Sequence, residues 1–260
     1  MKKEVIDSGI NELFDSISLE EMGKVKLMNR VDTKYVARID QIESLLRKAS
    51  SSYYLQTIDS EWNMPYYTCY FDTKDVNMFY EHQRGKKIRQ KIRIRQYLHS
   101  DTPPFLEIKS KNNKGRTKKK RRPMVEGTGL EAFEEFIDSN SRYDIADLNR
   151  RIENSFSRIT LVNKEMTERV TIDTNLEFHN FTTGKKLILP EIGIIEWKRD
   201  GLANKSELKK ILQDLHIHPR GFSKYCMGMA MTDPALKQNR IKTKIRMLSK
   251  LDPSLKRLNY

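Results

Sequence analysis

The chain has 260 residues, with 49 Lys and Arg against 35 Asp and Glu and a formal net charge of +14. Its hydrophobic fraction of 37% supplies enough apolar material for a core, so disorder throughout the chain is excluded. No apolar run approaches the roughly 18 residues of a membrane span, and the N-terminus lacks the apolar stretch of a signal peptide. Two distant cysteines exclude a disulfide framework, and we expect a soluble cytoplasmic protein.

The excess positive charge lies in one segment. Residues 84–122 hold 16 basic and 2 acidic side chains, and the rest of the chain holds 33 of each sign. The sequence therefore describes a neutral globular protein with one highly cationic segment.

Apolar spacing and capping residues predict several helices. In chain order they cover residues 10–22, 40–49, a short stretch through Tyr80 capped by Asp72 or Thr73, 130–137, 145–156, a helix opened by Ser206 and Glu207, and 234–251. We expect a single domain over residues 1–260, with a helical N-terminal arm over about 1–26 and a C-terminal helix over about 234–251.

The segments between these helices alternate with a period of two, which indicates strands. In residues 87–97 the odd positions are mostly Lys and Arg, and the even positions include Ile88, Ile92 and Ile94. Residues 106–111 place Glu107 and Lys109 opposite their apolar neighbours. After a turn at Gly115, the same rule predicts one shared face for Lys118, Lys120 and Arg122. Shorter alternations follow at 30–35, 158–161, 169–173 and 192–198.

A flat sheet with a solvated basic face is one interpretation of this pattern. Adjacent cations repel, however, and a protein without use for them could interleave acids. A closed barrel would turn every charged face inward and leave the apolar faces outside for helices to cover. Such a lumen suits a polyanion, because Arg and Lys both bind phosphate oxygens, and an isolated Glu can hold Mg²⁺ or Mn²⁺. Its acids would be Asp32, Glu107, Asp173 and Glu196.

Six short motifs carry a family resemblance. They are Arg-Val-Asp-Thr-Lys-Tyr at 30–35, Tyr-Phe-Asp-Thr at 70–73, Lys-Ile-Arg-Ile-Arg-Gln-Tyr at 91–97, Leu-Glu-Ile-Lys at 106–109, Ile-Glu-Trp-Lys at 195–198 and Phe-Ser-Lys-Tyr at 222–225. In this order they resemble the VTC-type polyphosphate polymerase domains, which are similar to the CYTH and triphosphate tunnel metalloenzymes. The resemblance covers roughly residues 27–231.

This resemblance implies an α+β fold, namely a closed antiparallel tunnel barrel with helices outside, and the use of divalent metal. Carried over residue by residue, it implies catalytic roles for Lys34, Arg93, Arg95, Lys109, Arg158 and Arg169, substrate binding by Lys120, Arg122, Lys198, Ser223 and Lys224, and a Mn²⁺ or Mg²⁺ ligand in Glu196. The sequence departs from the family pattern in lacking the paired-glutamate ExExK signature, and in having Phe156 and Gly221 at two positions where the polymerases tend to have other residues.

The many cations and few acids favour polymerisation over hydrolysis, because an acceptor phosphate is already deprotonated and its main barrier is repulsion between anions. We therefore expect a polyphosphate polymerase that moves the γ-phosphate of ATP onto a growing chain. The alternatives are a tunnel-type triphosphatase and a non-catalytic binding module for polyphosphate or nucleic acid. Nucleic acid is not the expected partner, because few aromatic residues lie between the cations. A membrane-associated partner is compatible with the sequence.

One substitution follows from the barrel interpretation. Arg95 is expected to line solvent and pack against nothing, so Arg95→Glu is expected to abolish transfer and leave the fold intact.

Overall fold

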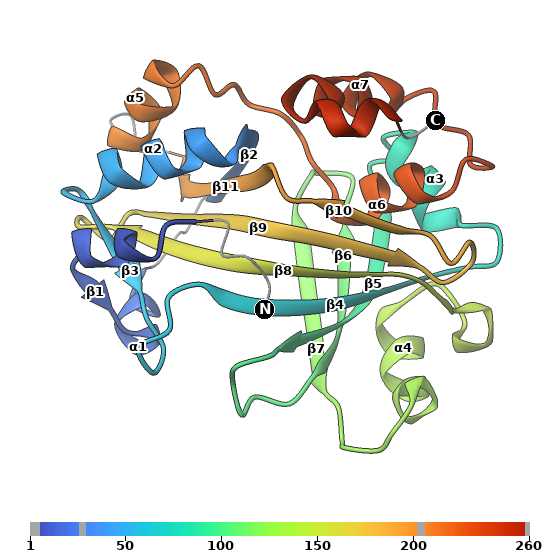
Figure 1. Ribbon diagram of the computed structural model, residues 1–260. Coiled ribbons are helices and arrows are strands. Elements are labelled where there is room, and N and C mark those ends of the chain that lie inside the picture. Colours follow the sequence, from blue (N-terminus) through green and yellow to red (C-terminus); the bar gives the residue numbers. More distant parts are fainter. Residues whose placement is uncertain (1–5, 26–29, 202–205, 258–260) are drawn as a thin grey trace.

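One long, mainly antiparallel sheet and the helices packed on it make up an α+β fold (Figure 1). The computed structural model describes residues 6–25, 30–201 and 206–257. Within them the strands are β1 (Ser16–Ile17), β2 (Arg30–Arg38), β3 (Tyr53–Gln56), β4 (Met64–Asp72), β5 (Arg89–Tyr97), β6 (Phe105–Lys111), β7 (Thr117–Pro123), β8 (Asn149–Asn163), β9 (Glu168–Asn180), β10 (Lys186–Leu189) and β11 (Ile192–Asp200).

The helices of the described residues are mostly short. They are α1 (Leu19–Met22), α2 (Ile39–Ala49), α3 (Asn77–Gln83), α4 (Glu134–Asn140), α5 (Glu207–Asp214), α6 (Lys224–Thr232) and α7 (Lys242–Leu251), with 3₁₀ helices η1 (Ser8–Leu13), η2 (Leu130–Phe133), η3 (Ile145–Asp147) and η4 (Pro253–Arg257). None of these helices has the length and apolar character needed to cross a membrane.

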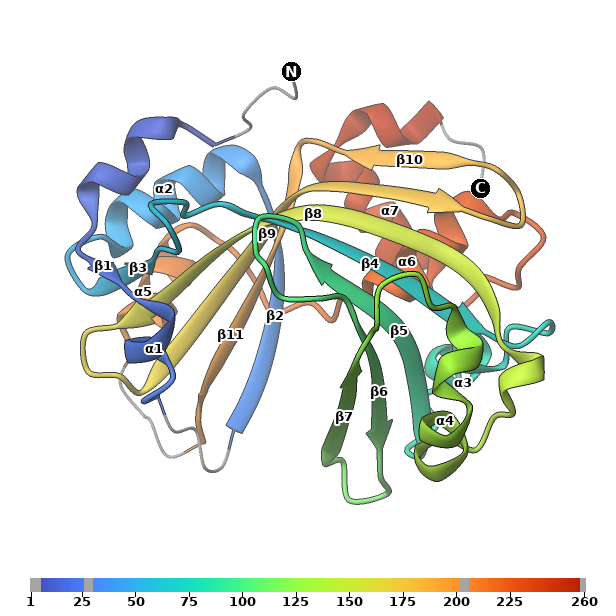
Figure 2. The ribbon, with the colours of Figure 1, turned by 90° about the horizontal axis from the view of Figure 1, so that it is seen from below.

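The sheet is open. Its main path runs β2-β11-β9-β8-β4-β5-β6-β7, with β1, β3 and β10 pairing at its sides. Figure 2 shows an arch with a first limb of β9, β11 and β2 and a second limb of β5, β6 and β7. Among the described residues the end strands β2 and β7 do not pair, so the predicted closed barrel is not confirmed. Both end strands carry cations on the concave face, and bringing them together would cost electrostatic repulsion.

Strand register sorts the side chains onto two faces, as the alternation predicts. Glu196 of β11 lies opposite Lys34 of β2 and Thr171 of β9. In the second limb Arg93 of β5 lies opposite Glu107 of β6. These residues share the concave face, because side chains directly opposite each other in a sheet point to the same side.

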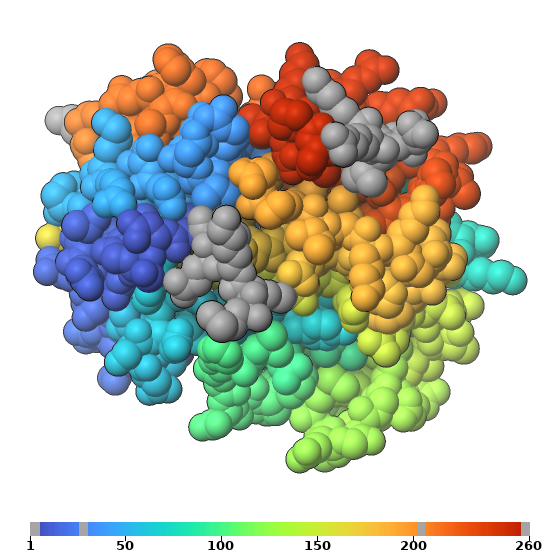
Figure 3. All heavy atoms as spheres, in the orientation of Figure 1, coloured from blue at the N-terminus to red at the C-terminus, as the bar shows by residue number. Residues whose placement is uncertain are grey.

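The convex face is apolar and covered by helices. On the first limb Ile159, Ile172 and Trp197 belong to one core cluster with the buried faces of α2 and α5. On the second limb Ile108 packs in a cluster with Ile137 of α4. Figure 3 shows α2 and α5, in blue and orange, on one side of the molecule and α7, in red, on the other. Helices α2 and α5 therefore cover the outside of the first limb and α4 that of the second, as expected from the sequence.

Helix α6 instead covers one end of the concave face. Its Tyr225 ring lies 5.3 Å from that of Tyr70 on β4. A Cβ at Gly228 would lie 2.6 Å from the Phe178 ring and 2.7 Å from Ile152 Cδ1, so only glycine permits this close approach. Apolar spacing does not predict this helix, because it is buried on all sides and has no polar face to alternate with an apolar one.

Asp72 ties α3 and α6 to the end of β4. Its carboxylate accepts hydrogen bonds from the backbone N–H groups of Thr73 (2.8 Å), Met78 (2.9 Å) and Phe79 (2.9 Å), and from the hydroxyl of Tyr225. The capping role predicted for Asp72 is present, and the bond to Tyr225 extends it to a second helix.

Three predicted helices differ from the structure. The N-terminal arm is η1, β1 and α1 rather than one helix, and residues 1–5 and 26 lie outside the described residues. The segment 145–156 is wrong as a helix, because only η3 is helical and β8 begins at Asn149. The C-terminal helix begins at Lys242 rather than 234. In the first two segments, the few apolar residues at helical spacing are also compatible with the strand period of two.

Candidate functional site

Charged side chains from both limbs of the arch gather on its concave face. We call this set the cationic face. Its members are Lys34 of β2, Lys91, Arg93 and Arg95 of β5, Glu107 and Lys109 of β6, Lys119 and Arg121 of β7, Arg158 of β8, Arg169 and Asp173 of β9, Glu196 and Lys198 of β11, and Lys224 of α6.

Glu196 occupies the first limb between two lysines. Lys34 forms an ion pair with its carboxylate, and Lys198 Nζ lies 2.9 Å from Oε2. Although burial opposes ionisation, Lys198 and Lys34 hold the pKa of Glu196 well below its usual value. The carboxylate is therefore ionised, and it faces the concave side.

Glu107 is the corresponding carboxylate of the second limb, and it too lies among cations. It pairs with Arg93, and Lys109 and Lys119 place their Nζ atoms 3.5 and 3.9 Å from its oxygens. Burial opposes the charge, but Arg93 and Lys109 lower the pKa of Glu107 to about 2. Every polar neighbour here is a cation, so the carboxylate fixes the positions of the basic side chains.

Asp173 joins the sheet to α6. Arg158 donates two hydrogen bonds to it, at 2.6 and 2.8 Å, and Lys224 forms an ion pair with the same carboxylate. Lys224 Nζ also lies 4.2 Å from the centre of the Phe156 ring. Burial lowers the pKa of Lys224 to about 8, against the attraction of Asp173. Through its contacts with Asp173 and Phe156, Lys224 at the start of α6 belongs to the cationic face.

Arg95 corrects one prediction. It is 9% exposed, its guanidinium lies 5.6 and 5.8 Å from the ring centres of Tyr66 and Phe156, and its Nε is 3.3 Å from Thr68 Oγ1. The expectation that Arg95 lines solvent and packs against nothing is wrong. The neighbouring aromatic rings bury its stem, so Arg95→Glu would disturb packing as well as charge.

The two limbs act on each other electrostatically. Arg93 is the main cause that lowers the pKa of Lys109 on β6 to about 7, and burial is the second. Glu196 of the other limb acts in the opposite direction and raises this pKa. Burial is the main cause that lowers the pKa of Lys91 to about 8, and Lys34 of the other limb contributes. Strands far apart in the sheet order therefore face one another across the arch.

The register of β6 and β7 corrects a second prediction. Lys109 lies opposite Lys119, and Glu107 lies opposite Arg121. Lys120 and Arg122, predicted to face the lumen, lie opposite Ile108 and Leu106 on the convex side.

The error is one residue of register, which moves a whole strand to the other face. The structure pairs Lys111 with Thr117 across a five-residue connection, and this pairing places Lys119 and Arg121 on the concave face.

The remaining predicted residues lie at the two ends of the cationic face. Ser223 caps α6 by accepting a hydrogen bond from Cys226 N and also accepts one from Lys91 Nζ, at 3.0 Å. At the other end, the Arg169 guanidinium lies 3.4 Å from the carbonyl oxygen of Met22. The structure thus brings ten of the twelve predicted site residues to the concave side.

The described residues contain no cluster of three or more His, Cys, Asp or Glu side chains that could enclose a metal ion. Glu196 can therefore supply only a single carboxylate. Mg²⁺ in proteins is commonly held by one or two carboxylates together with phosphate oxygens. A divalent ion at Glu196 would share its ligands with a bound phosphate and would compete with Lys34 and Lys198 for the carboxylate.

The cationic face predicts a pH-dependent affinity for inorganic triphosphate. Lys109 has a pKa near 7, so it is charged below that pH and loses its charge above it. We expect the affinity to fall as the pH rises through neutrality, with a midpoint at or above pH 7, because a bound anion raises the pKa of the lysine. Titration calorimetry across this range checks the profile. Lys109→Gln should remove the part of the fall nearest pH 7 and leave the part near pH 8 to which Lys91 and Lys224 contribute. An unchanged profile in that variant would contradict the assignment.

A comparison with known protein families gives a match over most of the chain. Residues 29–232 match the model of a family described as the VTC domain. No curated protein matches the chain.

Several solved structures are similar at low identity. A candidate adenylate cyclase from Vibrio parahaemolyticus has 12% identity and a TM-score of 0.45, with 78% of this chain and 99% of that chain covered. A candidate adenylyl cyclase from Hippeastrum, described as having a dominant triphosphatase activity, has 14% identity and a TM-score of 0.43, with 77% and 96% covered.

Proposed function

This chain belongs to the VTC domain family, and from that membership we propose that it is a metal-dependent polyphosphate polymerase. Its substrates would be ATP and an inorganic polyphosphate chain held against the cationic face. The observation that carries the proposal is the pairing of the three carboxylates Glu107, Asp173 and Glu196 with two or more cations each.

This pairing favours transfer to phosphate over hydrolysis. Hydrolysis needs a group that orients a water and accepts its proton, and a carboxylate whose pKa is held low by cations is a poor base. Transfer to a phosphate chain needs no base, because the terminal oxygen of the acceptor is already an anion. Its barrier is the repulsion between two anions, which surrounding Lys and Arg reduce.

The chemical step exchanges one phosphorus–oxygen bond for another. The terminal oxygen of the acceptor chain forms a bond to the γ-phosphorus of ATP, and the bond from that phosphorus to the oxygen bridging it to the β-phosphate breaks. ADP leaves with the electron pair of that bond, and the chain grows by one phosphate. The protein contributes position and charge rather than a covalent intermediate.

The geometry suggests how the side chains divide this task. Arg93, Arg95, Arg158 and Lys198 would hold the triphosphate of the nucleotide. Lys34, Lys109 and Lys224 would surround the transferring group and the acceptor. Lys119 and Arg121 would take the roles that the sequence predicts for Lys120 and Arg122. Arg169 would contact the phosphates at its end of the face, and Ser223 would offer its hydroxyl at the other end.

Glu196 would hold the divalent ion, which when bound neutralises charge on phosphate oxygens. We expect Glu196→Gln to lose the stimulation of activity by Mn²⁺, because the neutral amide is a weak ligand, and still to bind triphosphate. Activity assays at increasing Mn²⁺ and calorimetry without metal measure the two effects separately. Wild-type metal dependence in the variant would remove Glu196 from the metal site.

Incubation of the purified protein with ATP and Mn²⁺ tests the function directly. Long chains that stain with toluidine blue on a gel would support the polymerase. Release of free phosphate alone would identify a triphosphatase, and unchanged nucleotide would indicate a binding module. The Arg158→Gln/Lys198→Gln variant serves as the control, since any activity of the cationic face should disappear in it.

A further inference from the structure

The convex side of the second limb contains a cleft that the cationic face does not explain. Its volume is about 340 Å³, within the range of small-ligand pockets. One wall is the sheet and the other is the end of α4 with the segment after it. The lining residues are Gln90, Ser110, Lys118, Lys120, Ser139, Asn140, Ser141 and Arg142.

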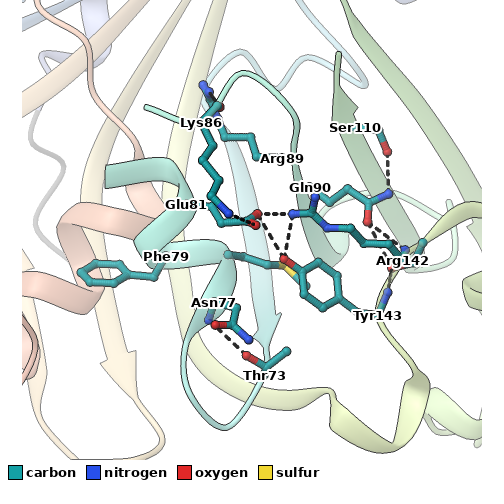
Figure 4. A network of polar contacts seen from close by, with 12 residues as sticks. Thr73, Asn77, Phe79, Glu81, Lys86, Arg89, Gln90, Ser110, Arg142 and Tyr143 are labelled. Carbon is teal, nitrogen blue, oxygen red and sulfur yellow. Dashed lines mark hydrogen bonds and ion pairs between the residues drawn. The ribbon is translucent and has the colours of Figure 1, made fainter. Parts of the chain in front are cut away.

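Hydrogen bonds hold the two walls of this cleft together. Gln90 Nε2 donates to Ser110 Oγ (2.9 Å) and to the carbonyl oxygen of Asn140 (3.0 Å), and Gln90 Oε1 accepts from Arg142 N (3.0 Å). Figure 4 shows Gln90 between Ser110 and Arg142. The cleft is thus formed by ordered groups on both sides.

The lining of the cleft favours an anion. Lys118 and Lys120 are exposed, and no carboxylate of the described residues forms an ion pair with either of them. The nearby acid Glu81 already pairs with Arg142 and Lys86 and accepts a hydrogen bond from Tyr143 Oη at 3.2 Å (Figure 4). Two lysines without acidic partners therefore face a cleft bordered by hydroxyl and amide groups.

Strand β7 joins this cleft to the cationic face. All seven of its residues are exposed, and it is the end strand of the open sheet. Lys119 and Arg121 point to the concave side, and Lys118 and Lys120 point to the cleft. Neighbouring strands are only about 4.8 Å apart, so a flexible chain of anions that crosses one edge strand can contact both sets.

We propose that β7 and the cleft behind it form a second binding site for inorganic polyphosphate, which holds the part of a long chain that has crossed the edge of the sheet. The site deepens the proposed function and rests on it. A long chain engages both faces of β7 at once, so its second contact is intramolecular and strengthens binding. Triphosphate is too short to do so and binds only the cationic face.

The test compares long polyphosphate with triphosphate. Calorimetry of the full chain should show tighter binding of the long chain to the wild type. In Lys118→Gln/Lys120→Gln we expect affinity for long polyphosphate to fall about tenfold and the salt dependence of binding to weaken, while affinity for triphosphate stays unchanged. The matched control is Lys185→Gln/Lys186→Gln, which removes two exposed lysines at the start of β10 and should change neither affinity.

The outcomes separate this inference from the proposed function. If the wild type binds triphosphate but gains nothing from chain length, or if the Lys118/Lys120 variant binds long polyphosphate as the wild type does, the second site is wrong and the proposed function stands. If neither anion binds the wild type, both fail. Poly-glutamate that binds the wild type as tightly as polyphosphate, with the same loss in the variant, would instead identify a surface for acidic proteins and would overturn the phosphate assignment.

Discussion

Replacing Lys109 with glutamine is expected to lower the rate of phosphoryl transfer from ATP to polyphosphate by about a hundredfold. Lys109 lies beside Glu107 on β6, and Glu196 of the opposite limb acts on it across the arch. In the proposed function its ammonium group would face the charge of both substrates. A quantitative gel of the polyphosphate formed, or an assay of ADP formation at saturating ATP, measures the rate.

The variant should fold normally, because 38% of the Lys109 side chain is exposed. Lys114→Gln is the matched control, since Lys114 is an exposed lysine in the turn between β6 and β7 and should leave the rate unchanged. Transfer by the Lys109 variant within about twofold of the wild type would show that this lysine does not contact the reacting phosphates.

Asp72→Ala is expected to lower the free energy of unfolding by roughly 3–5 kcal/mol. The carboxylate is fully buried and accepts four hydrogen bonds: two from backbone N–H groups in the first turn of α3, one from the backbone N–H of Thr73 and one from Tyr225 of α6. Alanine would leave all four donors buried without an acceptor. Urea unfolding followed by circular dichroism measures the loss.

The substitution should also weaken triphosphate binding, because α6 carries Ser223 and Lys224 into the cationic face. Asp72→Asn keeps the shape and one acceptor oxygen, so its loss of stability should be smaller than that of Asp72→Ala. An alanine variant whose unfolding free energy stays within about 1 kcal/mol of the wild type would mean that water replaces the lost acceptor.

The sequence predicts the strands of the site well because each carries a strict alternation over several residues. Residues such as Arg93 and Glu196 are assigned to the correct face on this basis alone. Register between strands is a weaker signal, since it depends on how the turn is formed. Where the turn was not counted, as between Lys111 and Thr117, Lys120 and Arg122 were assigned to the wrong side.

Two further features lay outside what alternation can predict. Closure depends on interactions between the first and last strands of the path, which are remote in the sequence, so a barrel and an open arch share the same pattern. Helix α6 is apolar on all sides, and its Met227, Met229 and Met231 resemble a strand when read by period. Its position on the concave face is set by tertiary packing against Phe178 and Ile152.

The open sheet has a further consequence at its two edges. Backbone groups on the outer edge of β2 are partly satisfied, because Arg220 N donates to Lys34 O (2.6 Å) and Tyr35 pairs with Pro219. Strand β7 pairs only with β6 among the described residues, which leaves a row of backbone donors and acceptors that another chain could extend. Its consecutive lysines and arginines would repel a second copy of the same strand, so we expect the basic segment to oppose self-association through this edge. Variants that neutralise β7 should therefore be compared as monomers, by size-exclusion chromatography before any binding measurement.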